Sequence, residues 1–263
     1  MPMQAEMTPM EMQSHMLVVS ETPRVQLHVI ESGPRNATMT IVFVHGYGGW
    51  ATQWLAQMEC FDTQTRVISI DLRGHGKSDR PRSTYSSDEL LGDLEKAFQL
   101  LNIKKPFVLV GHSFGAALVA EYAVRHPGDV ERLVLLNAST SYSVNALLRL
   151  PLLLPDWLID GVLNIINKQT LVYAAPSFVL KALYWDALSQ WNASEYFSKI
   201  TIPALVISPT GDPVFSQQEM DEVAQMIPGS KLIKIKVSTH MTMMRRPGEV
   251  NQAMAQFLGL SGC

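Results

Sequence analysis

Short apolar runs recur along this chain and predict strands. Some are uninterrupted, which is typical of a parallel strand covered on both faces. Others alternate between apolar and polar residues or are short and bounded by turn residues. The predicted strands are 17–20, 25–30, 40–44, 67–70, 107–110, 202–208 and 231–237.

Helical patterns separate these strands. Apolar residues recur at helical spacing in 50–61, 90–101 and 116–125. Alternation of buried strands with helices favours the α/β class, with a doubly wound and mostly parallel sheet. The sequence therefore predicts a core of layered helices around one sheet.

The segment 141–198 breaks this alternation. It is rich in leucine and aromatic residues, and prolines such as Pro151 and Pro155 divide it into short helical pieces. We predict that it forms a helical cap inserted after the sixth core strand. The core then comprises 17–140 and 199–263, and residues 1–16 form a mobile N-terminal extension.

Composition narrows the class of protein. The 263 residues suit one α/β domain with a modest insertion, and a net charge of −3 without long basic runs argues against a nucleic-acid partner. Cys60 and Cys263 form no metal-binding pattern and give no reason to assign an oxidising compartment. The first residues lack the apolar segment of a signal peptide or membrane helix, so we expect a cytoplasmic protein.

One motif carries candidate chemistry. Gly111-His112-Ser113-Phe114-Gly115 lies between a predicted strand and a predicted helix. In such a turn, glycines flank the serine because the backbone is crowded, and the strained conformation lifts the hydroxyl clear of the sheet. Ser113 is therefore the candidate nucleophile.

Several motifs together resemble the α/β-hydrolase fold superfamily, in particular its small single-domain esterases and lipase-like enzymes. They occur in the family's order and cover the chain from about residue 25 onward, apart from the middle segment. The motifs are HGYGGW at 45–50, DLRGHGKSD at 71–79, GHSFGAAL at 111–118, HPGDVERLVLLN at 126–137, IPALVISPTGD at 202–212 and H-x6-P at 240–247.

The resemblance implies a nucleophile, an acid and a histidine in that order along the chain. Ser113 matches the nucleophile, Asp212 the acid and His240 the base. A serine hydroxyl needs a base to accept its proton, and His240 follows the last predicted strand, in a loop that can reach Ser113. Asp212 follows the preceding strand, at the sheet edge where ligands bind in open α/β sheets.

Other site residues are expected from the loops around this triad. The glycines of 45–50 allow a close backbone approach, so the N–H groups of Tyr47 and Phe114 are the predicted oxyanion hole. His112, Trp157, Trp185 and Met241 are predicted to contact substrate. The 71–78 loop lacks the spacing of a phosphate-binding loop, and we expect Asp71 and Arg73 to tie loops together there.

The sequence thus predicts a serine hydrolase that cleaves carboxylic esters with a largely apolar acyl or alcohol part, without metal or cofactor. The same triad also serves C–C hydrolysis, thioester hydrolysis and acyl transfer, or a ligand sensor that hydrolyses slowly. We expect a monomer or homodimer. Membrane contact is not expected, although the apolar run 147–154 leaves a surface role open because it is too short to span a bilayer.

Overall fold

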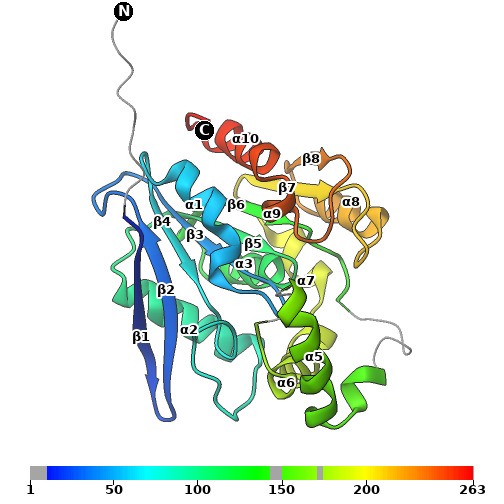
Figure 1. Ribbon diagram of the computed structural model, residues 1–263. Helices are drawn as coiled ribbons and strands as arrows, with labels where there is room; N and C mark the ends of the chain where they lie inside the picture. The colour runs from blue at the N-terminus through cyan, green and yellow to red at the C-terminus, as the bar shows by residue number, and fades with distance from the viewer. Residues whose placement is uncertain (1–10, 143–149, 171–173, 263) are drawn as a thin grey trace, which may run out of the picture.

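The structure is a computed structural model, and it describes residues 11–142, 150–170 and 174–262, with the backbone alone for 166–170. Eight strands form one sheet in the order β1-β2-β4-β3-β5-β6-β7-β8 (Figure 1). β1 and β2 run antiparallel to their neighbours, and the rest of the sheet is parallel. The predicted α/β class with a mostly parallel sheet is confirmed.

Seven of the strands overlap the predicted runs, whereas the strand at Val130–Leu136 was not among them, and the first strand begins earlier than expected. β1 begins at Gln13, so it includes the last residues of the segment predicted to be a mobile extension. The strands are β1 Gln13–Glu21, β2 Arg24–Ser32, β3 Thr40–Val44, β4 Arg66–Ile70, β5 Phe107–His112, β6 Val130–Leu136, β7 Ala204–Pro209 and β8 Lys231–Ile235.

Helices cover both faces of the sheet and also build the segment between β6 and β7. Single-turn 3₁₀ helices, marked η, connect several of them. The helices of the core are η1 Ala51–Trp54, α1 Leu55–Phe61, α2 Ser87–Leu100, α3 Phe114–Arg125, α8 Gln217–Met226, α9 Thr242–Arg245 and α10 Pro247–Leu258. Those of the cap are η2 Leu150–Leu153, α5 Asp156–Thr170, α6 Ser177–Asp186, η3 Leu188–Gln190, α7 Ala193–Tyr196 and η4 Phe197–Lys199.

Alternate residues of each central strand enter different apolar clusters, which explains the uninterrupted runs. In β3, Val42 and Val44 pack with α2 and α3, whereas Ile41 and Phe43 pack with α1 and α10. Figure 1 shows α1 and α10 on the near face of the sheet and α3 on the far face. Because both faces are covered, both side-chain sets of the strand are apolar.

Two further observations concern the chain as a whole. None of the helices in the described part of the chain is long and apolar enough to cross a membrane. Cys60, in α1, is buried and disulfide-bonded, which its sequence context did not reveal. Cys263, the other cysteine of the sequence, lies outside the described residues.

Candidate active site

Ser113 lies in the tight turn between β5 and α3. Its backbone has φ 53° and ψ −122°, a conformation that costs a residue with a side chain about 1–3 kcal/mol. A Cβ atom added to Gly111 would lie 2.4 Å from the carbonyl oxygen of Gly115, so strand and helix cross this closely only because Gly111 has no side chain. The Ser113 N–H donates to the carbonyl of Leu136 at 2.9 Å, which fixes the turn against β6.

Asp212 and His240, from the loops after β7 and β8, form a hydrogen-bonded pair. His240 Nδ1 donates to Asp212 Oδ2 at 2.9 Å. Asn137 Nδ2 donates to the same oxygen at 2.8 Å, and the Val214 N–H donates to Oδ1 at 2.7 Å.

These contacts decide the charge of Asp212. Burial by itself raises the pKa of the Asp212 carboxyl, but His240, Asn137 and Val214 together outweigh it and lower the pKa below its usual range. The carboxylate therefore stays ionised at neutral pH and holds the His240 proton on Nδ1. That tautomer leaves Nε2 as the ring atom that can accept a proton from a serine hydroxyl.

His112 connects His240 to the turn that carries Ser113. Its Nε2 donates to the main-chain carbonyl of His240 at 2.8 Å, and the two ring centroids are 4.8 Å apart. Burial, followed by the neighbouring charge of His240, lowers the pKa of His112 to about 3. The ring is therefore neutral, and its hydrogen bond holds the His240 backbone beside the turn that carries Ser113. The predicted contact of His112 with substrate stays a prediction.

The loop 45–50 lies directly against this turn. A Cβ atom on Gly46 would lie 2.9 Å from the Cβ of Ser113. The Gly49 N–H donates to the carbonyl of Gly46 at 3.0 Å, and the Gly48 N–H donates to His75 Nε2 at 3.2 Å. The amides of Gly48 and Gly49 are thus engaged within the protein and are not the donors of an oxyanion hole.

Tyr47 and Phe114 remain the predicted oxyanion donors. Tyr47 follows Gly46, and its hydroxyl donates to the carbonyl of Leu180 in α6 at 2.9 Å, which ties this loop to the cap. Phe114 is the first residue of α3, and the first N–H groups of a helix have no acceptor within it. Both backbone segments therefore lie at the turn that carries Ser113.

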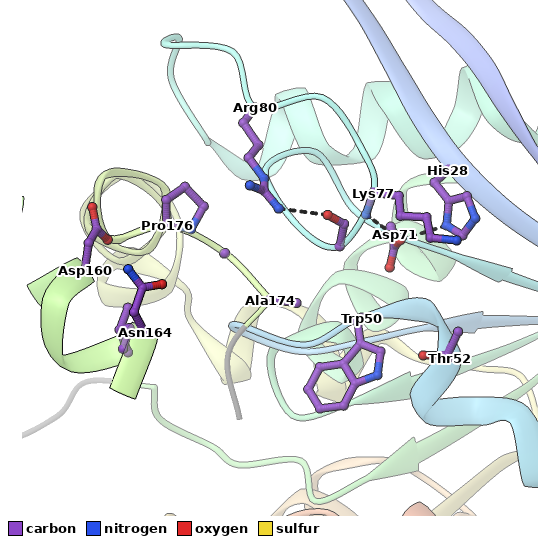
Figure 2. A pocket seen from close by; sticks show the side chains of 13 residues that line it. His28, Trp50, Thr52, Asp71, Lys77, Arg80, Asp160, Asn164, Ala174 and Pro176 are labelled. Carbon is purple, nitrogen blue, oxygen red and sulfur yellow. Dashed lines mark hydrogen bonds and ion pairs between the residues drawn. The ribbon is translucent and has the colours of Figure 1, made fainter. Parts of the chain in front are cut away.

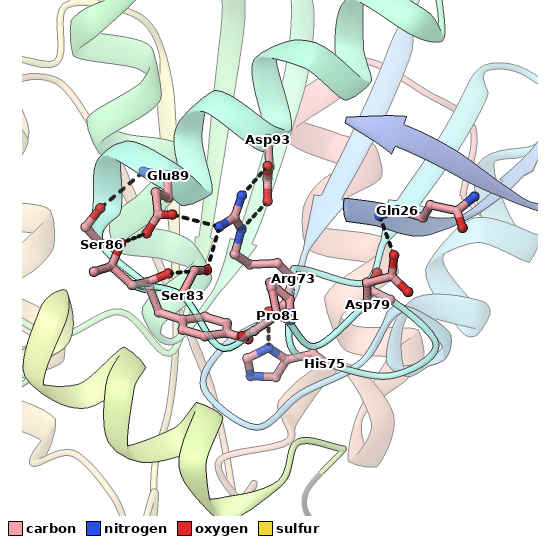
Figure 3. Close-up of polar contacts among 12 residues, drawn as sticks. Gln26, Arg73, His75, Asp79, Pro81, Ser83, Ser86, Glu89 and Asp93 are labelled. Atoms are coloured by element: carbon pink, nitrogen blue, oxygen red, sulfur yellow. Dashed lines mark hydrogen bonds and ion pairs between the residues drawn. The ribbon is translucent and has the colours of Figure 1, made fainter. Parts of the chain in front are cut away.

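The 71–76 loop contacts both the glycine loop and α2, and Figure 3 shows its contacts with α2. Arg73 forms a buried two-point ion pair with Asp93 of α2, at 2.6 Å from Nε and 2.7 Å from the second guanidinium nitrogen. His75 Nδ1 donates to the carbonyl of Arg73, which leaves Nε2 to accept the Gly48 N–H. Asp71 Oδ1 accepts the N–H of Ala51 at 2.5 Å. Asp71 and Arg73 tie loops together as predicted.

Three residues at the site were not predicted. Tyr142 is buried, and its hydroxyl donates to the carbonyl of Ser113 at 2.8 Å. Its ring lies 5.5 Å from Phe215, whose ring lies 5.3 Å from that of His240. Asn137, which orients Asp212, ends one of the quoted motifs at the carboxyl end of a strand and was detectable there. Tyr142 and Phe215 lie in irregular segments, where the pattern carries no such signal.

Comparison with known proteins agrees with this architecture. The model of a protein family described as the alpha/beta hydrolase fold matches residues 40–171, half of the chain. The chain belongs to this family. An uncharacterised protein of Mycobacterium tuberculosis is 28% identical over 275 residues, covering 89% of this chain and 78% of that protein.

Solved structures of similar fold extend the comparison. The enol-lactonase from Burkholderia xenovorans has a TM-score of 0.77 at 23% identity, covering 89% of this chain and 97% of its own. A thermophilic esterase from Thermogutta terrifontis has a TM-score of 0.76 at 20% identity, covering 94% and 98%. At these identities the likeness establishes the fold that this α/β hydrolase shares with them.

The described contacts of Trp157, Trp185 and Met241, which were predicted to contact substrate, do not involve the triad side chains. Trp157 of α5 is 74% exposed, and Trp185 of α6 is 40% exposed with its ring against Tyr184. Met241 is partly buried against the apolar cluster of α1 and α10. The described contacts therefore give these three assignments no support, and they stay predictions.

One cavity, drawn in Figure 2, lies between the loops after β3 and β4 and the cap. It has a volume of about 660 Å³, and Trp50, Lys77 and Asn164 are among its lining residues. None of its described lining residues is Ser113, Asp212 or His240.

Proposed function

We propose that this α/β hydrolase is a serine hydrolase that cleaves carboxylic esters through an acyl-enzyme. Ser113 is the nucleophile, His240 the general base and acid, and Asp212 the residue that orients the imidazole. The backbone N–H groups of Tyr47 and Phe114 are assigned to the oxyanion hole.

The observation that carries this proposal is the backbone conformation of Ser113. A serine at φ 53° is strained, and strain of this kind persists where the surrounding structure enforces it, often at functional sites. Here the Ser113 N–H is bonded to β6 and its carbonyl to Tyr142, so the conformation is held at both ends. These contacts keep the Ser113 hydroxyl in a strained strand-to-helix turn, as a serine nucleophile in this position requires.

The mechanism follows from the His240 tautomer, in which Nδ1 carries the proton and Nε2 is the acceptor. His240 Nε2 accepts the Ser113 proton as Oγ attacks the ester carbonyl, and the resulting imidazolium is stabilised by the ionised Asp212. The Tyr47 and Phe114 amides stabilise the negative oxygen of the tetrahedral intermediate. His240 then donates its proton to the leaving alcohol. Water, activated by the same nitrogen, releases the acid and regenerates the serine.

The aromatic side chains near the triad favour an apolar substrate. The ring of Tyr142 contacts those of Phe114, Trp191 and Phe215, with centroid distances from 5.4 to 6.1 Å. Phe114 and Tyr142 are buried in the core, whereas Phe215 is partly exposed beside His240, and each substrate methylene buried against such a side chain contributes about 0.8 kcal/mol. We therefore propose esters with an apolar acyl or alcohol part.

The test combines active-site labelling with a substrate series. A fluorophosphonate probe should label the wild-type protein stoichiometrically at Ser113. With p-nitrophenyl esters from acetate upward, kcat/KM should rise about three- to fourfold per methylene until the apolar site is full. The Ser113→Ala variant should fold normally, resist labelling and lose several orders of magnitude in kcat.

Different failures have different meanings. Labelling at another residue, or substantial activity in Ser113→Ala, would refute the nucleophile. Labelling at Ser113 without turnover of any ester would refute ester hydrolysis and direct attention to C–C bonds, thioesters or acyl transfer. One burst followed by little further product would indicate a ligand sensor.

Location and assembly stay predictions. The cytoplasmic location expected from the sequence is tested by nothing in the structure and stays a prediction. The monomer or homodimer expected from the sequence awaits a sedimentation measurement.

A further inference from the structure

A second arrangement of serine, histidine and aspartate lies outside the candidate active site. Ser14 Oγ of β1 is 2.8 Å from His28 Nε2 of β2, and His28 Nδ1 is 2.8 Å from Asp71 Oδ2. The sheet brings these residues together, because β2 lies between β1 and β4 and Asp71 directly follows β4. None of the three belongs to the triad around Ser113.

The hydrogen bonds of this arrangement define where its protons lie. Asp71 Oδ2 also accepts the N–H of Lys77 at 2.9 Å, and Oδ1 accepts the N–H of Ala51 at 2.5 Å. An ionised carboxylate is the matching acceptor for N–H groups on both of its oxygens, so His28 Nδ1 carries a proton that it donates to Asp71. In the neutral imidazole Nε2 is then the acceptor, and the Ser14 hydroxyl donates to it. A serine nucleophile and its general base have this proton arrangement.

Burial fixes the base and leaves the hydroxyl accessible. His28 and Asp71 are each 3% exposed, so little water competes for the hydrogen bond between them. The backbone of His28 is fixed as well, because its N–H donates to Ser78 Oγ at 2.8 Å. Ser14 is exposed and lies on β1, which is the edge strand of the sheet. A reagent in solution can therefore reach the hydroxyl while the imidazole keeps its orientation.

The backbone around Ser14 limits the acyl donors that it can use. Ser113 precedes the first N–H groups of α3, which have no acceptor within the helix. Ser14 instead lies within a β-strand, whose N–H groups pair across the sheet with β2. The lack of one oxyanion donor lowers a rate by about 10²–10³-fold. Ser14 should therefore react only with carbonyl groups that carry a good leaving group, and far more slowly than Ser113, so a stoichiometric fluorophosphonate probe marks Ser113 alone.

We propose that Ser14 is a second nucleophilic serine, which accepts one acyl group from an activated ester or thioester. Its Oγ attacks the carbonyl carbon while His28 Nε2 takes the hydroxyl proton, and the Asp71 carboxylate stabilises the imidazolium. The bond from the carbonyl carbon to the leaving oxygen or sulfur then breaks, and His28 returns the proton to that atom. The product is an ester on Ser14. Attack of water on this ester lacks the same oxyanion donors, so the acyl group remains as a modification.

The test uses the full chain with Ser113→Ala, so that the serine of the candidate active site cannot react. The protein is incubated at neutral pH with excess p-nitrophenyl acetate, and mass spectrometry of its peptides locates and quantifies the acetyl groups. Ser14 should gain up to one acetyl group per chain, faster than any other serine. Ser198 is the matched internal control, since it is also exposed but its Oγ donates to the carbonyl of Ser194 at 2.8 Å and not to an imidazole.

The role of His28 is tested in the same background. His28→Asn removes the base and should lower the rate of acetylation at Ser14 by about 100-fold or more. His15→Asn is the matched control, because His15 is the neighbour of Ser14 in β1 and successive side chains of a strand point to opposite faces of the sheet. This control should leave the rate unchanged. Circular dichroism establishes that both variants keep the fold.

A second measurement leaves the buried pair of His28 and Asp71 in place. A thiol beside the His28 imidazole forms a thiolate more readily than a thiol in solution, and the thiolate is the nucleophile. The Ser14→Cys variant should therefore react with iodoacetamide at neutral pH at least about fivefold faster than the Ser198→Cys variant. Both substitutions lie at exposed positions, so neither should disturb the core.

Several results would overturn the proposal. They are absence of acetylation at Ser14, equal rates at Ser14 and Ser198, an unchanged rate in folded His28→Asn, and equal alkylation of the two cysteine variants. Each would make the arrangement only a structural link between β1 and the loop after β4. Acetylation is measured without the Ser113 hydroxyl, so the failure of this proposal is distinguishable from the failure of ester hydrolysis at Ser113.

Discussion

The stability of this protein should fall steeply in mild acid because histidines are buried in the neutral form. His75 is fully buried between the two loops beside Ser113, and burial, with His45 next to it, lowers its pKa to about 3. His112 has a pKa of about 3 for the same principal reason. In the unfolded chain a histidine has its ordinary pKa of about 6.5.

The sign and size of the effect follow from these values. Below about pH 6.5 the unfolded chain binds protons that the folded His75 and His112 refuse, so acid favours unfolding. The stabilising contribution of each neutral histidine to the free energy of unfolding is complete above pH 6.5, and it is lost as the pH falls toward 3. Between pH 7 and pH 5 each should reduce the free energy of unfolding by about 2 kcal/mol, and the pair by about 4 kcal/mol.

The variant His75→Asn removes one of these titrations. Urea unfolding measured from neutral pH to about pH 4.5 should give a curve of stability against pH that is shallower than wild type by about 1.4 kcal/mol per pH unit in the acidic range. Val119→Ala in α3 is the matched control, since it removes buried volume and no titrating group. It should displace the curve downward without changing its slope. An unchanged slope in His75→Asn would refute the reasoning.

Three further predictions concern the triad and the loop beside it. Asp212→Asn should keep the fold, seen by circular dichroism, while kcat falls by up to about 10⁴-fold; a near-normal rate would mean that Asp212 does not orient the base. Asn137→Ala removes a donor to Asp212, should raise the pKa of that carboxyl and should loosen its hold on the His240 ring, so kcat should fall while the fold is kept, whereas an unchanged kcat would contradict this role. Arg73→Gln leaves the buried Asp93 without its partner and should cost about 3–5 kcal/mol in urea unfolding, most of which Asp93→Asn should restore in the double variant.

Much of the fold could be read from the sequence because its signals are local. The continuous apolar run Thr40–Val44 follows from two covered faces, and the tight turn at Ser113 follows from the glycines that a close strand-to-helix crossing requires. Ser113, Asp212 and His240 were assigned from their places after strands and from the resemblance of the motifs. The structure places each of them at the carboxyl end of a strand, as those positions require.

Only the tertiary structure decided which groups meet. Asn137 and Asp212 are 75 residues apart, and their hydrogen bond depends on β6 and β7 being neighbours in the sheet. Tyr142 reaches the carbonyl of Ser113 from an irregular segment, where no period of apolar residues fixes a side chain's direction. The cap shows the same limit most clearly. Its leucines and tryptophans suggested a substrate pocket, but apolar character does not specify a face, and the packing of α5 turns Trp157 and Ile165 toward solvent. Burial depends on what lies opposite a side chain, which is a property of the assembled fold and not of the residue.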